Sequence, residues 1–174
     1  MLRQKPAYEV VSGGLGSGKS NYALSTVNNE DTLVLGAGTR WFELLNTRFG
    51  SIRRHEKEVE RLGFEYQTTR PWTIAKDIEK IRHSVVLIDE WTTFRHYSIF
   101  WSKKRVMDTI REIFDAINNN PHITRAVFVC SDEVPYLPFS LYKKTVLWNK
   151  LLFRIADKIT VMYFGIPSVL KAKT

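Results

Sequence analysis

Residues 8–20 read Tyr-Glu-Val-Val-Ser-Gly-Gly-Leu-Gly-Ser-Gly-Lys-Ser. The run Tyr8–Ser12 predicts a strand, and Gly13–Ser20 fits the phosphate-loop pattern G-x-x-x-x-G-K-[ST] at every required position. Its glycines let backbone N–H groups wrap closely around a phosphate. A helix starting near Lys19 would point its positive end at the same anion. The stretch therefore predicts a nucleoside triphosphate site on a strand–loop–helix unit.

The loop residues have distinct predicted roles. Lys19 is expected to reach the β- and γ-phosphates as the catalytic cation, and the Ser20 hydroxyl is expected to ligate Mg²⁺. The nucleotide, GTP or ATP, is expected to contact the whole loop: Gly13, Gly14, Leu15, Gly16, Ser17, Gly18, Lys19 and Ser20. These residues predict the class of ligand and leave the reaction open.

Strand-like runs alternate with helical patterns along the chain. Strands are expected at 8–12, 32–35, 64–67, 85–89, 126–130 and 159–164, and helices at 19–27, 52–62, 73–82, 106–118 and 146–156. Such alternation is typical of parallel βαβ units. We therefore expect an α/β fold, a P-loop NTPase-like three-layer α/β/α arrangement with a mainly parallel sheet. It would form a single nucleotide-binding domain over residues 1–174.

A second chemical site is predicted where Val85–Asp89 meets Glu90. Four apolar residues ending in an acid describe a buried parallel strand with a carboxylate at its tip, where open α/β sheets bind ligands. Asp89 is expected to hold Mg²⁺ beside Ser20, directly or through water. Glu90 either polarises a water or hydroxyl, or points away from the site.

Composition narrows the class of protein. The chain has 174 residues, 44% of them hydrophobic, which is enough to bury the core of one domain. No apolar stretch approaches the length of a membrane span, and the N-terminal residues lack the apolar region of a secretory signal. Cys130 lies in an apolar run and predicts a buried core thiol. These features favour a cytoplasmic protein.

The net charge of +8 is compatible with nucleic acid, an anionic membrane surface or polyanionic nucleotides. The basic residues are spread along the chain without a block of five or six, and no nucleic-acid reading motif is visible. A solvated basic surface is the simpler interpretation.

Among the four histidines, His55 differs in context because it lies in the basic segment Ser51–His55. Neighbouring cations favour the neutral, nucleophilic imidazole. A lone histidine is more often structural, and both interpretations stay open. His83, His96 and His122 are expected to be packing or surface residues.

Several segments follow one another in the order of a known family. They are Gly13–Ser20 as Gly-Gly-x-x-Ser-Gly-Lys-Ser, Ser51–His55 as Arg-Ile-x-x-His, Asp89–Phe94 as acid-Cys-Leu-Thr-x-Trp, Ser131–Val134 as Ser-Asn-Glu-Val, and Gly165–Pro167 as Gly-Leu-Pro. Over about residues 8 to 171 the chain resembles the bifunctional adenosylcobinamide kinase/adenosylcobinamide-phosphate guanylyltransferases of cobalamin biosynthesis. It departs from their pattern at Ser51 and over Ser140–Val146.

The resemblance implies two reactions on one chain. The first phosphorylates adenosylcobinamide, using Lys19, the loop amides, and Mg²⁺ on Ser20 and Asp89. The second transfers a guanylyl group from GTP through a guanylyl-histidine intermediate on His55. Its implied partners are a nucleotide and a corrinoid, and its implied assembly is a homotrimer.

Two other functions are compatible with the same residues. A P-loop motor or packaging-type ATPase acting on nucleic acid would use the basic charge, the acidic pair Asp89–Glu90, and Ser131 as a polar sensor at a strand tip. A nucleotide-binding assembly protein would keep the phosphate loop without catalysis.

Overall fold

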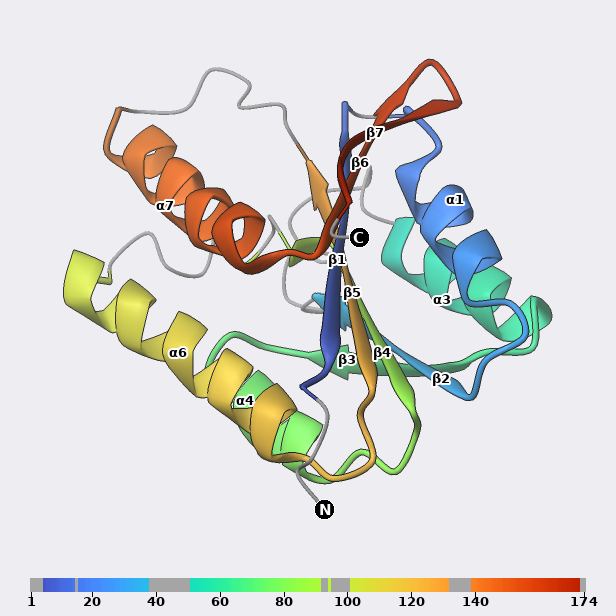
Figure 1. The fold of residues 1–174 in the computed structure, drawn as a ribbon, viewed down its shortest axis with the longest axis horizontal. Coiled ribbons are helices and arrows are strands. Elements are labelled where there is room, and N and C mark those ends of the chain that lie inside the picture. Colours follow the sequence, from blue (N-terminus) through green and yellow to red (C-terminus); the bar gives the residue numbers. More distant parts are fainter. Residues whose placement is uncertain are drawn as a thin grey trace.

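The centre of the fold is one twisted sheet. The computed structural model describes residues 5–14, 16–37, 51–91, 94, 101–131 and 139–172. In these residues seven strands form a sheet in the order β3-β2-β4-β5-β1-β6-β7 (Figure 1). They are β1 (Ala7–Gly13), β2 (Thr32–Ala37), β3 (Glu65–Thr69), β4 (Val85–Asp89), β5 (Arg125–Ser131), β6 (Lys158–Tyr163) and β7 (Ile166–Ala172). All neighbouring pairs are parallel except β6 and β7, as expected for a mainly parallel sheet.

Helices cover both faces of the sheet. They are α1 (Lys19–Thr26), α3 (Ser51–Arg61), α4 (Ile74–Glu79), α6 (Lys103–Asn119) and α7 (Phe139–Ile155). Figure 1 shows α1 and α3 on one side, and α4, α6 and α7 on the other. The three-layer α/β/α class predicted from the sequence is therefore confirmed.

The core has two parts because strand side chains alternate between the faces of the sheet. Val34, Leu87 and Val127 belong to the cluster under α1 and α3. Ile88 and Phe128 belong to the larger cluster under α4, α6 and α7. Strand β4 is buried along its whole length, as expected for a central parallel strand covered on both faces. Cys130 is fully buried, as predicted.

The helices differ from expectation mainly at their ends. Helix α6 begins three residues before the predicted start because Ser102 caps it, its Oγ accepting a hydrogen bond from the Arg105 backbone N–H. Helix α7 begins seven residues before the predicted Val146, and α4 is shorter at both ends than the predicted 73–82. In the described residues no helix is long and apolar enough to cross a bilayer.

Strand β7 was missing from the expected elements. It pairs antiparallel with β6 through a turn at Phe164–Gly165. Most side chains on both faces of β7 are exposed, so its sequence lacks the alternation of apolar and polar residues that predicts a strand. Its Pro167 is typical of an edge strand.

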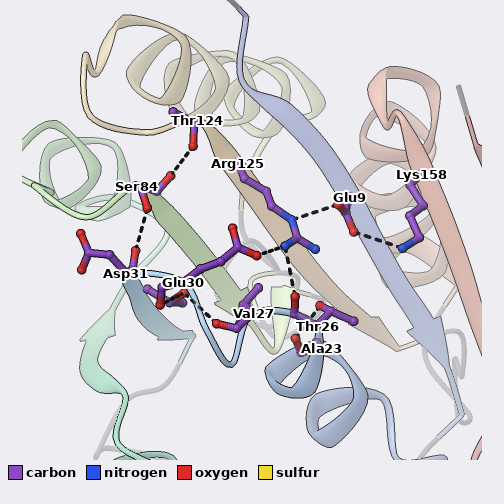
Figure 2. A network of polar contacts seen from close by, with 11 residues as sticks. Glu9, Ala23, Thr26, Val27, Glu30, Asp31, Ser84, Thr124, Arg125 and Lys158 are labelled. Atoms are coloured by element: carbon purple, nitrogen blue, oxygen red, sulfur yellow. Dashed lines mark hydrogen bonds and ion pairs between the residues drawn. The ribbon is translucent and has the colours of Figure 1, made fainter. Parts of the chain in front are cut away.

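One half-buried arginine holds the end of the sheet at which the strands begin (Figure 2). The Arg125 Nε donates to Glu9 Oε1 at 2.9 Å, and its Nη1 donates to the Thr26 carbonyl at 3.2 Å and to Glu30. Lys158 Nζ lies 3.8 Å from the other oxygen of Glu9. The network joins β5, β1, β6 and the turn after α1, and the Arg125 side chain is only 17% exposed.

Arg125→Met should therefore destabilise the protein. The substitution leaves Glu9 half-buried with only the distant Lys158 amine, so the free energy of unfolding should fall by about 2 kcal/mol. Urea unfolding followed by circular dichroism measures it. The matched control is Arg111→Met, which removes an exposed helical pair with Asp108 at 3.6 Å and should cost about 0.5 kcal/mol or less. Equal losses in the two variants would contradict the role given to Arg125.

Candidate functional site

The phosphate loop joins β1 to α1 in a shape that needs glycine. A Cβ on Gly13 would lie 2.6 Å from Ser17 Oγ and 2.7 Å from the Met162 carbonyl oxygen of β6. Gly18 is the N-cap of α1 in the left-handed region, with φ of 83°. With no side chain on the cap, the first amides of α1 are open to an anion. The loop thus has the form of an anion cradle.

Two loop side chains complete this cradle. Lys19 Nζ donates to the Gly14 carbonyl at 3.2 Å, which holds the ammonium over the loop. The Ser17 hydroxyl is buried and has no hydrogen-bond partner in the described part of the chain. A buried polar atom without a partner is costly, and a bound phosphate would supply one. Leu15 lies outside the described residues.

The structure brings Ser20 and Asp89 together. Ser20 lies on α1, which follows β1, and Asp89 ends β4, with β5 between these two strands in the sheet. Helix α1 crosses β5 and contacts β4, so that the Ser20 Oγ donates to Asp89 Oδ1 at 3.2 Å. Asp89 is 1% exposed. A hydroxyl and a carboxylate oxygen at this separation can occupy two neighbouring positions around Mg²⁺, which binds oxygen at about 2.0–2.1 Å. The two predicted metal ligands therefore fit the ion.

Glu90 follows β4 in a strained turn. Its φ of 59° is uncommon for a residue with a side chain and costs about 1 kcal/mol. Its N–H donates to Asp89 Oδ1 at 2.8 Å. The turn leaves Glu90 exposed and buries the next residue, Trp91, whose ring centroid lies 5.1 Å from that of Trp148. Burial of this tryptophan holds the carboxylate of Glu90 at the edge where the loop lies.

Tyr66 on β3 is a site residue that the sequence analysis did not single out. Its hydroxyl lies over Gly36 of β2, so close that a Cβ on Gly36 would be 1.8 Å from it. Burial raises the pKa of Tyr66 well above its usual range, and so do the negative charges of Asp89, Glu56 and Glu90. A glycine inside a strand indicates a close approach of this kind, but the predicted strand 32–35 ended one residue before Gly36, so this signal was missed.

The β6–β7 hairpin also reaches the loop. The Gly165 N–H donates to the Ser17 carbonyl at 3.2 Å, and the Gly165 Cα lies 3.9 Å from the position of a Cβ on Gly18. Beside it, Phe164 is 99% exposed. The sequence marked Gly165 only as part of a family-like ending, so its contact with the loop is new.

Of the four histidines, His83 and His122 have side chains that the structure describes. His55 lies on α3, one turn before Val59, which is buried in the cluster shared with α1. The side chain of His55 is outside the described residues, as are His96 and its surroundings. His83 lies near two carboxylates, and His122 contacts Arg82 at 2.8 Å on the exposed surface. Both agree with the expected packing or surface roles.

Comparison with known proteins supports the fold. No known protein family matches the sequence, and no curated protein does. Among solved structures, a protein of Pyrococcus horikoshii OT3 is similar over 99% of this chain and 90% of its own, with a TM-score of 0.55 and 8% identity. An ATPase from the type III secretion system of pathogenic bacteria is similar over 95% of this chain, with a TM-score of 0.52 and 13% identity. This chain spans 57% of that ATPase. The likeness shows a P-loop-like α/β fold.

Gly13→Ala should disrupt the cradle. The added methyl group meets Ser17 Oγ and the Met162 carbonyl, so the loop must shift and affinity for a fluorescent ATP analogue should fall at least tenfold, by roughly 1.4 kcal/mol or more. Gly63→Ala is the matched control, because its φ of 87° also strains an alanine but nothing lies within 4 Å of the new Cβ. Unchanged affinity in Gly13→Ala would remove this loop from the binding site.

Proposed function

We propose that the chain binds a nucleoside triphosphate with Mg²⁺ and transfers its γ-phosphoryl group. The 3.2 Å contact between Ser20 Oγ and Asp89 Oδ1 carries this proposal, because two oxygens at this separation could both bind one Mg²⁺. The Ser17 hydroxyl without a partner and the open amides of α1 support it. So does the fold, which the chain shares with an ATPase.

Phosphoryl transfer needs position and neutralised charge more than covalent help. The loop amides and Lys19 would hold the β- and γ-phosphates, with Lys19 moving from the Gly14 carbonyl to the phosphate oxygens. Ser20 and Asp89 would hold Mg²⁺, which would supply positive charge to neutralise the phosphates. With water as the acceptor, Glu90 would take its proton as oxygen bonds to the γ-phosphorus, and the nucleoside diphosphate and phosphate would leave.

Two variants separate binding from turnover. Lys19→Ala should weaken binding of the ATP analogue by at least about tenfold, since a charge-assisted contact to phosphate is lost. Glu90→Gln should keep this affinity while phosphate release falls roughly 100-fold, because the amide cannot accept the proton. Glu58→Gln, on the exposed side of α3, is the control and should behave as the unmodified chain. Full turnover in Lys19→Ala would refute the phosphate-loop assignment.

A narrower proposal names the acceptor as the hydroxyl of adenosylcobinamide, followed by guanylyl transfer to the phosphorylated product. It rests on the sequence resemblance over residues 8 to 171, which also implies a homotrimer. His55 would attack the α-phosphorus of GTP through a neutral ring nitrogen, and pyrophosphate would leave. The position of His55 on α3, the helix that covers the same face of the sheet as α1, is compatible with this role.

Incubation with GTP followed by mass spectrometry tests the narrower proposal. We expect a GMP adduct on His55, and we expect His55→Asn to lose the adduct while still phosphorylating adenosylcobinamide. An unmodified His55, or an adduct that persists in His55→Asn, would exclude the guanylyl-histidine step and leave the phosphoryl transfer untouched.

The net charge of +8 favours a second acceptor class, in which phosphoryl transfer to water is coupled to nucleic acid. Strong stimulation of ATP hydrolysis by DNA, together with no reaction on the corrinoid, would select this function. Nucleotide binding without turnover under either condition would select a non-catalytic assembly protein.

A further inference from the structure

We propose that Tyr66 is a positioning residue of the nucleotide site, whose hydroxyl, lying over Gly36, orients the acidic end of β4 toward the phosphate loop. This inference rests on the proposed function and adds to it a residue from β3, two strands beyond the predicted site.

The register of the sheet places the residues concerned on one face. Tyr66 is aligned with Val34 and Thr68 with Gly36, while Gly36 is in turn aligned with Asp89. Aligned residues of parallel neighbours share a face, and this is the face that α1 and α3 cover. The Tyr66 ring runs along its own strand toward Thr68, so that its hydroxyl reaches the level of Asp89.

Gly36 makes this reach possible. The position of a Cβ on Gly36 is 1.8 Å from the Tyr66 hydroxyl and 2.4 Å from its ring carbon Cζ. Any other residue would push the ring out of this position. The phenol therefore occupies the place of a Gly36 side chain on this face. Asp89 is the aligned residue of the neighbouring strand, and such strands are about 4.8 Å apart.

The phenol of Tyr66 lies among negative charges. Three carboxylates act on it, from Asp89 and Glu90 at the end of β4 and from Glu56 on α3. The Tyr66 hydroxyl itself is hydrogen-bonded to the side chain of Thr68 on the same strand, which holds it in this position. The Asp89 Oδ1 already accepts from Ser20 and from the Glu90 N–H. The phenol over Gly36 closes the β2 side of Asp89, so that it limits the rotation of this carboxylate.

Tyr66→Phe is the principal test, because phenylalanine keeps the ring that packs against the cluster under α1 and α3 and removes only the hydroxyl. We expect kcat for ATP hydrolysis to fall roughly tenfold, with KM and the affinity for the ATP analogue within about twofold. Tyr22→Phe is the matched control, because Tyr22 packs against the same cluster from α1. It should leave both constants unchanged.

A spectroscopic measurement separates positioning from packing. In protein labelled with ¹³C at the tyrosine Cζ, the Tyr66 resonance is identified by its loss in Tyr66→Phe. Adding Mn²⁺ and ADP should broaden it. Tyr8, whose hydroxyl bonds Asn118 under the opposite layer of helices, should keep a sharp resonance. Gly36→Ala should move the Tyr66 resonance and reproduce the loss of kcat.

The outcomes distinguish this inference from the proposed function. If the unmodified chain turns over ATP and Tyr66→Phe matches it in kcat, or if Tyr66 stays as sharp as Tyr8, the positioning role is overturned and the proposed function stands. If neither nucleotide binding nor turnover is found in the unmodified chain, both fall together.

Discussion

Parallel pairing is the constraint on which the rest of this molecule depends. Because β1, β2, β4 and β5 all run in one direction, their carboxyl ends meet at a single edge. The glycine loop, the acid of β4 and the glycine of β2 are far apart in the sequence, and this edge brings them side by side. Antiparallel neighbours would have alternated these ends between two edges.

The two ends of the sheet carry different kinds of interaction. At the amino ends, the Arg125 side chain contacts three other groups and satisfies its charge within the fold. At the carboxyl ends, Glu90 has a costly backbone conformation and Ser17 a buried hydroxyl without a described partner. Unfavourable features of this kind are stable only where surrounding packing imposes them, and they gather at functional sites. Here the buried Trp91 imposes the conformation of Glu90.

The sequence predicted those parts of the structure that depend on short-range patterns. The loop, the burial of β4 and the meeting of Ser20 with Asp89 followed from motif and hydrophobic run. The start of α6 was predicted three residues too late, because the prediction followed the apolar periodicity from Val106 and the capping Ser102 lies before it. Tyr66 could not be found because its position depends on the register of three strands, which no local pattern specifies. Strand β7 lacked alternation because neither face of it enters the core. The side chain of His55 lies outside what the structure describes, so its role stays a prediction.

The bond between Gly165 and Ser17 has a consequence for how the protein is made. The phosphate loop is translated well before the β6–β7 hairpin, yet the Gly165 N–H of that hairpin ties its backbone at Ser17. Strand β6 must also pair with β1 before the Met162 carbonyl can close on Gly13. Contacts between such distant segments form late. A nascent chain therefore carries the complete motif without the finished cradle until the β6–β7 hairpin has been made and β6 has paired with β1.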